Sequence, residues 1–267
     1  MLPVSQSDHV DVNVPSSTSD DSAAIVKLST LVTIATYNEI ENLPRLLDEI
    51  FSYAPDIDVL VIDDNSPDGT GHWCDERSQT DSRLQCLHRS GKFGLGSATI
   101  AGQKFAIERD YEFVLNMDAD FSHHPRYINN LLSAMMVGGD ETPDVMIGSR
   151  YVPGGRVEGW SFKRHFMSRT VNFFARRLLG LRTRDCSGAF RCYRTAFLKQ
   201  LDYGQIKSHG YAFQEEILWH LKRLGARMGE IPIVFVDRQH GESKIDGEAF
   251  SAAYILFRLG LRNWLRI

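Results

Sequence analysis

The sequence predicts an α/β fold with a doubly wound, parallel sheet. Between residues 30 and 150, short apolar runs alternate with segments whose apolar residues recur at helical spacing, and this alternation is typical of parallel strands joined by helices. The apolar runs are rich in β-branched residues and poor in polar ones, as in strands buried on both faces. A ligand should therefore bind beyond the carboxyl ends of the strands.

The expected elements follow one another regularly in the first half of the chain. Strands are expected at 30–36, 58–64, 84–89, 111–118 and 144–150. Helices are expected between them, at 42–54, 70–80, 96–110 and 126–136. The second half is different, with helices expected at 162–181, 210–225 and 249–267 and a strand at 229–238. The first and last of these helices are amphipathic.

Length and composition indicate an ordinary globular protein. The chain has 267 residues, of which 43% are apolar and 24% charged, enough for one large domain. Residues 1–26 are rich in Ser and Asp and contain no aromatic residue, which predicts a disordered tail. The folded domain is expected over 27–245, followed by an amphipathic helix within 246–267.

Other classes of protein are disfavoured by what the sequence lacks. No apolar run approaches the roughly 18 residues that span a bilayer, and the N-terminus does not resemble a secretion signal. The four cysteines show no CxxC spacing, so we expect free thiols in a reducing cytosol. There is also no GxGxxG after the first strand, which argues against a Rossmann dehydrogenase.

Charge is unevenly distributed along the chain. Residues 1–80 carry fifteen acidic and three basic residues, whereas residues 150–199 carry twelve basic and two acidic ones. Such a basic block could face nucleic acid, anionic lipid, phosphorylated substrates or simply solvent. It lacks the repeated aromatic residues on which bases stack, so no nucleic acid is expected as a partner.

Polar clusters stand where the expected strands end, and the most informative is the DAD of residues 118–120. Asp118 and Asp120 follow an apolar strand, and two carboxylates this close repel each other unless a cation or a proton lies between them. In extended geometry both would point the same way, toward a hard divalent cation such as Mg²⁺ or Mn²⁺. The alternative is a solvated turn with two incidental acids.

The ends of the first two strands offer groups for a nucleotide. Tyr37 could pack on a base, and Glu39 and Asp64 could accept hydrogen bonds from a ribose. The alternatives are local structure: Asn38 as a helix cap, and Asp68 with Gly69 as a turn that opens a helix.

Two further stretches remain ambiguous. The glycines of GKFGLGSAT fit neither standard phosphate-loop pattern, and a tight start of the next helix explains them equally well. His123 and His124 are adjacent on a loop without a carboxylate helix motif, so zinc binding is disfavoured. Pro125 is expected at the first position of the next helix.

Six stretches of the chain, taken together and in order, resemble a known family. They are TYNEIENLP, VIDDNSPDGT, MDADFSHHP, GSRYVPGG, SGAFRCYR and DRQHGESK. They are similar to the GT-A-fold glycosyltransferases of family 2, and among these to the dolichol-phosphate (polyprenyl-phosphate) mannose synthases, over about residues 30–250. The resemblance implies a Rossmann-like GT-A fold: a doubly wound, mixed but mostly parallel sheet with helices on both faces and amphipathic helices at the C-terminal end.

The same resemblance implies a set of site residues. The nucleotide donor would contact Ala35, Tyr37, Glu39, Ile62, Asp64, Asp118, Ala119 and Asp120. Related enzymes often have proline where Ala35 stands. Asp118 and Asp120 would hold Mg²⁺ or Mn²⁺, together with Ser122, which stands where some relatives have a glutamine ligand. Asp120 and Arg150 are the expected catalytic residues.

Phosphate groups would meet the basic residues of the second half. The resemblance implies that Arg238 and Lys244 close over the phosphates of the donor and that Arg150 meets a donor or acceptor phosphate. Arg164 and Ser168 would bind the phosphate of the lipid. Their i, i+4 spacing places them on one face of a helix, and arginine presents a planar fork that suits phosphate.

The implied reaction is mannose transfer from GDP-mannose to a polyprenyl monophosphate, which yields polyprenyl-phosphate mannose and GDP with inversion. The last helix carries Arg258, Arg262 and Arg266 as one stripe beside apolar residues, as in a helix that lies on a membrane; packing on the domain is the alternative. The enzyme would then be peripheral on the cytoplasmic face of a membrane, with small membrane subunits as possible partners. A glucosyl- or aminosugar transferase of the same fold, or a non-catalytic nucleotide-binding module, remain as alternatives.

Overall fold

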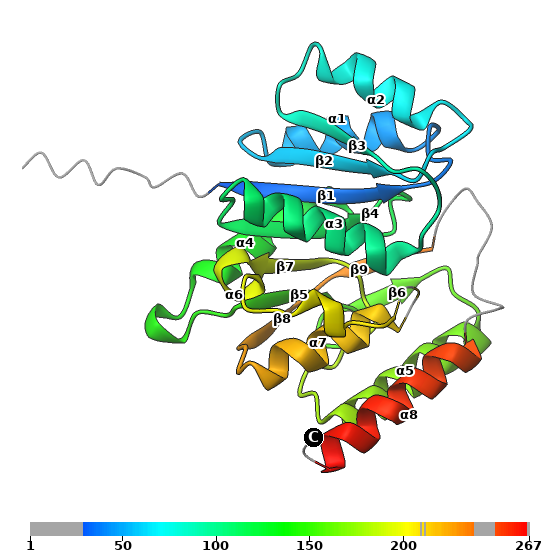
Figure 1. Ribbon diagram of the computed structural model, residues 1–267, viewed down its shortest axis with the longest axis vertical. Helices are drawn as coiled ribbons and strands as arrows, with labels where there is room; N and C mark the ends of the chain where they lie inside the picture. Colours follow the sequence, from blue (N-terminus) through cyan, green and yellow to red (C-terminus); the bar gives the residue numbers. More distant parts are fainter. Residues whose placement is uncertain (1–28, 209, 211, 238–248, 266–267) are drawn as a thin grey trace, which may run out of the picture.

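A seven-stranded sheet forms the centre of the protein (Figure 1). The computed structural model describes residues 29–208, 210, 212–237 and 249–265; the expected tail over 1–26 lies outside them. The strand order is β3-β2-β1-β4-β7-β5-β8. The bounds are β1 Thr30–Thr36, β2 Asp58–Asp63, β3 Leu84–His88, β4 Phe113–Asp118, β5 Val145–Ser149, β7 Arg191–Arg194 and β8 Met228–Pro232.

Strand β7 alone runs antiparallel to its neighbours within this sheet, β4 and β5, so the sheet is mixed but mostly parallel, as expected. The chain places β2 on one side of β1 and β4 on the other. A crevice therefore opens between the ends of β1 and β4, because the connections leave in opposite directions there. The register sets Ala35 of β1 beside Ile62 of β2 and Asp118 of β4.

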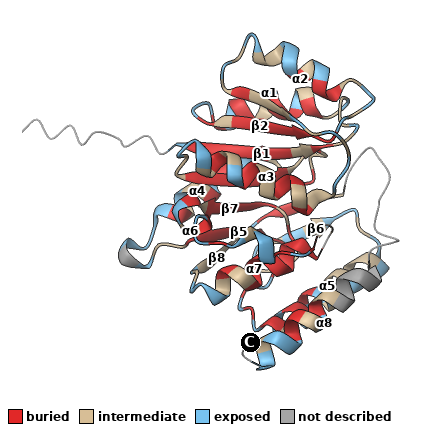
Figure 2. Cartoon of the chain, in the orientation of Figure 1, coloured by how far each residue is buried: buried red, intermediate tan, exposed pale blue. Residues whose placement is uncertain are grey.

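Helices cover both faces of the sheet and enclose two apolar cores (Figure 2). The helices of the first face are α1 Leu43–Tyr53, α2 Thr70–Ser78 and α4 Ile128–Met136, with a short 3₁₀ turn at Pro125–Tyr127. Those of the second face are α3 Leu95–Glu108, α5 Phe162–Leu179, α6 Thr195–Leu198, α7 Phe213–Arg223 and α8 Ala249–Leu265. Helix α1 contributes the apolar stripe Leu43, Leu46, Leu47 and Ile50, all fully buried, as its i, i+3, i+4, i+7 spacing dictates.

Two parts of the second half differ from the sequence-based expectation. The prediction of a single strand at 229–238 is wrong. This segment forms two strands, β8 and β9 (Val234–Val236), which belong to two different sheets. Strand β9 pairs with β6 (Arg156–Glu158). The break follows Pro232, which has no N–H with which to continue a ladder. Strand β7 was not expected at all, because its sequence RCYR lacks the apolar pattern of a buried strand.

Helices α5 and α8 lie side by side at the C-terminal end of the fold (Figure 1). Leu256 and Leu259 of α8 are buried in the second core, whereas Phe257, Leu261 and Trp264 are exposed. Helix α8 therefore packs on the domain through one face and leaves the other open; Arg266 lies outside the described residues. Among the described helices, none combines the length and apolar character needed to cross a membrane. All four cysteines are free thiols, as expected.

We expect Gly102→Ala to destabilise the fold, although alanine is the better helix former by about 1 kcal/mol. A Cβ at Gly102 of α3 would lie 2.8 Å from Cγ2 of Thr33 and 2.9 Å from Cδ1 of Ile62, so α3 would have to move off the sheet. The expected loss is roughly 1–3 kcal/mol of unfolding free energy, measured by denaturant titration. Gly91→Ala, where the nearest atom is 3.9 Å away, is the control and should be neutral. A stabilised Gly102→Ala variant would contradict this close packing.

Candidate functional site

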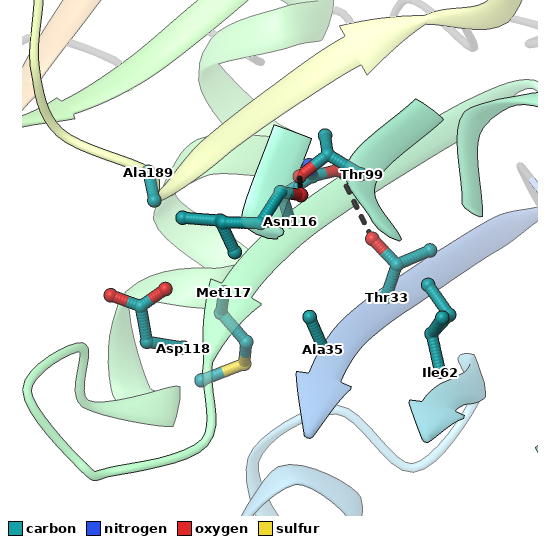
Figure 3. Close-up of a pocket in the computed structure, with 9 residues that line it drawn as sticks. Thr33, Ala35, Ile62, Thr99, Asn116, Met117, Asp118 and Ala189 are labelled. Atoms are coloured by element: carbon teal, nitrogen blue, oxygen red, sulfur yellow. Dashed lines mark hydrogen bonds between the residues drawn. The ribbon is translucent and has the colours of Figure 1, made fainter. Parts of the chain in front are cut away.

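A narrow pocket opens where β1, β2 and β4 end, under the first turns of α3 (Figure 3). It contains three residues expected to bind the donor, Ala35, Ile62 and Asp118, which the strand register sets next to one another. Its other lining residues are Thr33, Leu95, Thr99, Asn116, Met117 and Ala189. The hydroxyl of Thr33 donates to Oδ1 of Asn116 at 3.0 Å, so the floor of the pocket is polar and fixed.

The loops after β1 and β2 are held together beside this pocket. Three backbone N–H groups of the first loop donate to side chains of the second: Asn38 to Ser66, Glu39 to Thr70 and Ile40 to Asp68, at 3.0–3.1 Å. Asp68 also caps Thr70, so the expected turn that opens α2 is present. The alternative role of Asn38 as a helix cap is wrong: α1 begins at Leu43, and Asn38 has a φ of 62°. This bonding fixes the loop that carries Tyr37 and Glu39 relative to the second strand end.

Asp64 is buried at the end of β2 and faces a cation. Nη1 of Arg89 lies 3.2 Å from Oδ1 of Asp64. Burial raises the pKa of the Asp64 carboxyl, and the Arg89 charge opposes that shift. The preceding acid, Asp63, instead accepts hydrogen bonds from Thr36 and Ser66. The expected contact between Asp64 and the donor stays a prediction.

The glycine-rich stretch after β3 contacts the same region. Lys92 lies with its Nζ 4.6 Å from the centre of the Tyr37 ring, so this loop adds positive charge beside the pocket. Gly94 is the N-terminal flanking residue of α3 and has a φ of 89°, a conformation that favours glycine. The tight start of a helix therefore explains this glycine.

The DAD loop turns sharply after β4. Asp118 ends the strand, while Asp120 lies in a bend in which Phe121 has a φ of 60°. Oδ1 of Asp120 accepts from the backbone N–H of Ser122 at 3.1 Å. The hydroxyl oxygen of Ser122 is buried and, within the described part of the chain, has no hydrogen-bond partner. The two carboxylates and the unpartnered hydroxyl oxygen are hard oxygen donors of the kind that Mg²⁺ and Mn²⁺ prefer, so the chemistry of these residues fits the expected cation.

His123 belongs to the core rather than to a zinc site. It is buried, its ring stacks on Phe190 with centroids 5.1 Å apart, and burial lowers its pKa to about 4. It is therefore neutral at physiological pH and adds no positive charge next to Asp118, whose Oδ2 lies 3.5 Å from its Nδ1. His124 accepts instead from the backbone N–H of Arg126.

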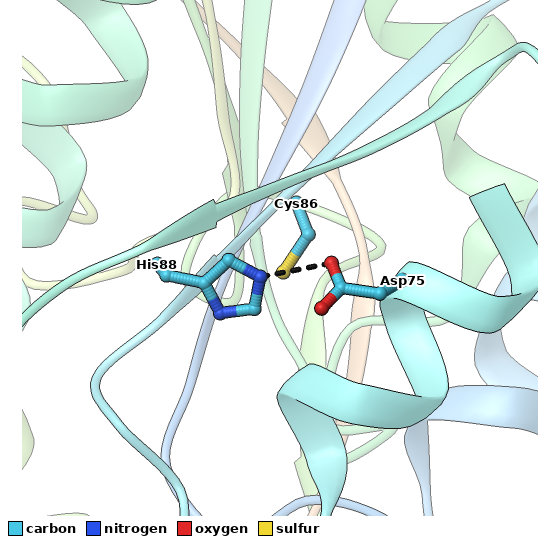
Figure 4. A group of neighbouring side chains, drawn as sticks. All are labelled: Asp75, Cys86 and His88. Atoms are coloured by element: carbon cyan, nitrogen blue, oxygen red, sulfur yellow. Dashed lines mark hydrogen bonds and ion pairs between the residues drawn. The ribbon is translucent and has the colours of Figure 1, made fainter.

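Only one group of three potential metal ligands of the Cys, His, Asp or Glu type occurs in the described ranges (Figure 4), and two of its members lie on β3, an edge strand of the sheet. The group consists of Asp75, Cys86 and His88. Nε2 of His88 and Oδ1 of Asp75 are 2.8 Å apart, so these two satisfy each other. Contact with the Cys74 thiol, together with burial, raises the pKa of the Cys86 thiol, so it stays protonated and is a poor ligand. The group is explained as a hydrogen-bonded His–Asp pair beside two thiols.

Arg150, an expected catalytic residue, is locked into a buried ion pair. Its Nε and Nη2 each donate to Asp185 at 2.7 Å, and Nη2 also donates to Ser187. Burial disfavours both charges, but the pairing prevails: it lowers the pKa of the Asp185 carboxyl and raises that of the Arg150 guanidinium. The structure therefore fixes the orientation of Arg150. Its expected contact with a phosphate stays a prediction.

The two residues expected to bind the lipid phosphate do lie on one face of α5. Nη1 of Arg164 donates to Oδ1 of Asp237 at 2.7 Å, and the hydroxyl of Ser168 accepts from the Tyr151 hydroxyl at 2.7 Å. Ser168 is thus connected to Tyr151, the neighbour of Arg150. Arg238 and Lys244 lie outside the described residues.

Comparison with known proteins identifies the family of this chain. Residues 31–202 match Glycosyl transferase family 2. The chain belongs to this family. It is 43% identical over 225 residues to an undecaprenyl-phosphate mannosyltransferase of Micrococcus luteus, across 84% of this chain and 90% of that protein. It is 42% identical over 238 residues to a polyprenol monophosphomannose synthase of Mycolicibacterium smegmatis, across 88% of each.

A solved glycosyltransferase structure has the same architecture. PcManGT, a mannosyltransferase of Pyrobaculum calidifontis in complex with GDP-Man and Mn²⁺, matches with a TM-score of 0.53 over 89% of this chain and 64% of that one, at 17% identity. An identity this low shows the fold alone. The expected GT-A fold, with its mixed and mostly parallel sheet, is confirmed.

Sequence reasoning missed several buried charged residues of this glycosyltransferase. Arg191 and Glu215 are fully or almost fully buried, and both lie close enough to Asp185 to interact with its charge. The Arg191 guanidinium donates to the backbone oxygens of Cys186 and Gln214, so it ties α7 to the loop that holds Arg150. Oε2 of Glu215 has no hydrogen-bond partner in the described structure. In the sequence, the only signal was two consecutive acids in a segment with otherwise apolar helical spacing.

We expect Glu215 to make the stability of this glycosyltransferase depend on pH. Burial raises the pKa of its carboxyl from 4.5 to about 7. Between these values the folded state keeps a proton that the unfolded chain has lost, so the free energy of unfolding falls as pH rises through this window. Glu215→Gln removes this contribution. Its stability relative to wild type should therefore rise by roughly 3 kcal/mol from pH 4.5 to pH 8.

Denaturant titrations at several pH values measure this difference. Glu108→Gln on the exposed side of α3 is the control, and its pH profile should follow wild type. Parallel profiles for Glu215→Gln and wild type would show that Glu215 ionises normally in the folded protein.

Proposed function

We propose that this glycosyltransferase transfers mannose from GDP-mannose to a polyprenyl monophosphate. The observation that carries the proposal is the convergence of three features at the carboxyl ends of the strands. Asp118 belongs both to the pocket and to the DAD loop, it lies close enough to act electrostatically on Arg150, and Arg150 and Arg164 contact the same indole ring, that of Trp160. The names of the two relatives support the sugar and the lipid acceptor. The ligands of PcManGT support the donor and a divalent cation.

The donor would occupy the pocket with its nucleoside toward β2 and its diphosphate toward the DAD loop. Asp64 is a buried acid at the end of β2 and suits the hydroxyls of a ribose or the N–H of a base. Tyr37, Glu39 and Ala119 would complete the nucleotide site. Asp118, Asp120 and Ser122 would hold Mg²⁺ or Mn²⁺, which neutralises a diphosphate leaving group by Lewis-acid polarisation.

The acceptor needs little chemical activation. A phosphate monoester is already an anion near neutral pH, so no strong general base is required, and catalysis consists of holding two anions together and stabilising the departing charge. Arg164 and Ser168 would bind the acceptor phosphate, and the rigid Arg150 would stabilise the negative charge between donor and acceptor. Arg238 and Lys244 would cover the phosphates of the donor. A single displacement of this kind inverts the anomeric centre.

A glucosyl- or aminosugar transferase of the same fold is the second candidate, because a few pocket contacts decide the sugar. Incubation of the protein with a polyprenyl phosphate and each labelled nucleotide sugar in turn separates the candidates. Transfer of glucose or of an amino sugar in preference to mannose would overturn the proposed donor.

We expect Asp120→Asn to lower the rate of mannose transfer by at least a hundredfold, because it removes a carboxylate from the cation site. Binding of Mn²⁺ in the presence of GDP, followed by electron paramagnetic resonance, should weaken in parallel. Asp110→Asn is a matched control, because this surface acid pairs with Lys199 far from the pocket, and it should behave like wild type. Wild-type rates for Asp120→Asn would refute its role.

We propose further that α5 and α8 rest on the cytoplasmic face of a membrane, with α5 as well as α8 supplying the contact. Exposed apolar side chains on α5 include Phe162, Phe166, Phe173 and Phe174. Exposed arginines lie among them, and neither helix contains an acidic residue. Apolar side chains flanked by cations suit an interface of anionic lipid. Small membrane subunits could contact the same face.

We expect the double substitution Phe166→Ser with Phe173→Ser to weaken binding to vesicles of anionic phospholipid by tenfold or more, because it removes two apolar groups of about 1.5–3 kcal/mol each. Flotation of the protein with vesicles measures the bound fraction. Met136→Ser with Val137→Ser, an exposed apolar pair at the end of α4, is the control. Equal losses for both pairs would argue against α5 as the contact.

A further inference from the structure

Two hydrogen-bond donors near the expected acceptor site are buried without a partner. They are Nε1 of Trp160 and Nε of Arg164, and neither bonds to any other described group. A buried donor without a partner costs about as much as a lost hydrogen bond, so such groups require an explanation. Both donors belong to one short stretch, the end of the β6 loop and the first turn of α5.

The surroundings of these donors suit an anion. The guanidinium carbon of Arg164 lies 4.4 Å from the centre of the Trp160 ring, and that of Arg150 lies 5.4 Å from the same centre. Two arginines therefore flank the indole, and the field at its N–H group favours negative charge. Both unpartnered atoms are N–H donors, as phosphate oxygens require.

Asp237 now provides the negative charge for Arg164. Its backbone N–H donates to the backbone carbonyl oxygen of Glu158 at 2.9 Å, so Asp237 is anchored to β6. Close packing helps to hold it there, because a Cβ on Gly159 would lie only 2.9 Å from the Cβ of Asp237. The Arg164–Asp237 pair is more accessible than the Arg150–Asp185 pair: side-chain exposure is 25% and 29% against 7% and 0%. A partly exposed pair is the weaker of the two and can exchange partners.

This stretch also adjoins the DAD loop. The ring of Phe235 lies between them, with its centroid 5.3 Å from His123 and 5.3 Å from Trp160. In addition, the backbone N–H of Val236 donates to the backbone carbonyl oxygen of Ser122 at 3.3 Å. A phosphate bound at Trp160 would therefore sit one aromatic ring away from the loop that is expected to hold the donor's diphosphate.

We propose that the indole N–H of Trp160 and the unpartnered Nε–H of Arg164 together bind the phosphate of the acceptor. Asp237, which accepts from Nη1 of the same guanidinium, is then an internal anion that balances the charge of Arg164 until the phosphate takes over this role. The proposal rests on the proposed function, of which it specifies the acceptor site. Trp160 is then a substrate-binding residue, and Asp237 is a positioning residue that lowers the affinity for the acceptor in exchange for an ordered Arg164.

Trp160→Phe tests the first half, because phenylalanine keeps an aromatic ring under Arg164 and removes only the N–H donor. Farnesyl phosphate, a short polyprenyl monophosphate, is titrated by calorimetry, with GDP plus Mn²⁺ and inorganic phosphate in parallel titrations. We expect the affinity for farnesyl phosphate to fall roughly tenfold or more, with GDP affinity unchanged. In turnover assays the KM for the lipid should rise by the same factor while that for GDP-mannose stays constant.

Trp73→Phe on α2, at the opposite edge of the sheet (Figure 1), is the matched control and should bind both ligands like wild type. Unchanged affinity for farnesyl phosphate in Trp160→Phe would overturn the role of the indole. A loss confined to GDP would assign these donors to the diphosphate of the donor and would equally overturn the proposal. Equal losses of farnesyl phosphate and inorganic phosphate would place the contact at the phosphate, as proposed, rather than at the lipid chain.

Asp237→Asn tests the second half through the sign of its effect. Without its charge, the side chain no longer competes with phosphate for Arg164, so the affinity for farnesyl phosphate should increase severalfold. If Asp237 only orients Arg164, the same substitution should weaken binding, and that result would overturn its role as a displaceable anion. Glu158→Gln removes an equal charge from the adjacent strand, where it pairs with Arg156, and should leave the affinity unchanged.

Failure of the proposed function looks different from failure of this inference. A wild-type protein that binds neither GDP nor farnesyl phosphate and transfers no sugar would refute the function. A wild-type protein that binds and transfers normally, with unaltered Trp160→Phe and Asp237→Asn variants, would refute the inference alone.

Discussion

Acidic side chains gather where the parallel strands end, and their mutual repulsion constrains this whole edge of the fold. Most are neutralised locally: Asp63 by hydroxyl and backbone donors, Asp64 by Arg89, and Asp68 by the backbone of the neighbouring loop. Next to the DAD loop, burial keeps His123 neutral, so this histidine adds no positive charge there. A divalent cation bound by Asp118 and Asp120 would add positive charge at this end of the sheet.

Two arginines in the second half of the chain are likewise paired with carboxylates. Arg150 is matched by Asp185 in the interior, where breaking the pair would leave an uncompensated buried charge. Arg164 is matched by Asp237 at a partly exposed position. Burial thus separates a permanent cation from one whose partner can change, although both are arginines near the same pocket. Strand β9 connects the region of these arginines with the DAD loop. It pairs with β6, and its residues Phe235 and Val236 contact the DAD loop.

Much of the fold could be predicted, because its apolar periodicity is strong. The five strands expected in the first half occur within a residue or two of their predicted bounds, since continuous β-branched runs have few alternatives. Strand β7 could not be predicted, because it is short and its ends are arginines that the tertiary structure buries or pairs. The single strand expected at 229–238 failed at Pro232, where the chain changes sheets to pair with a distant segment.

The sequence alone determined the alternation of strands and helices, the motifs at the strand ends and, through their order, the family. These are properties of residue type and spacing, which neighbours far away in the chain do not alter. The tertiary structure decided the rest: that Ala35, Ile62 and Asp118 share one pocket, that Arg150 is held by Asp185, and that Trp160 and Asp237 lie against Arg164. Apart from Trp160 and Arg164, which are close in the sequence, such partners are separated by tens of residues, and only the register of the sheet and the packing of α5 bring them together.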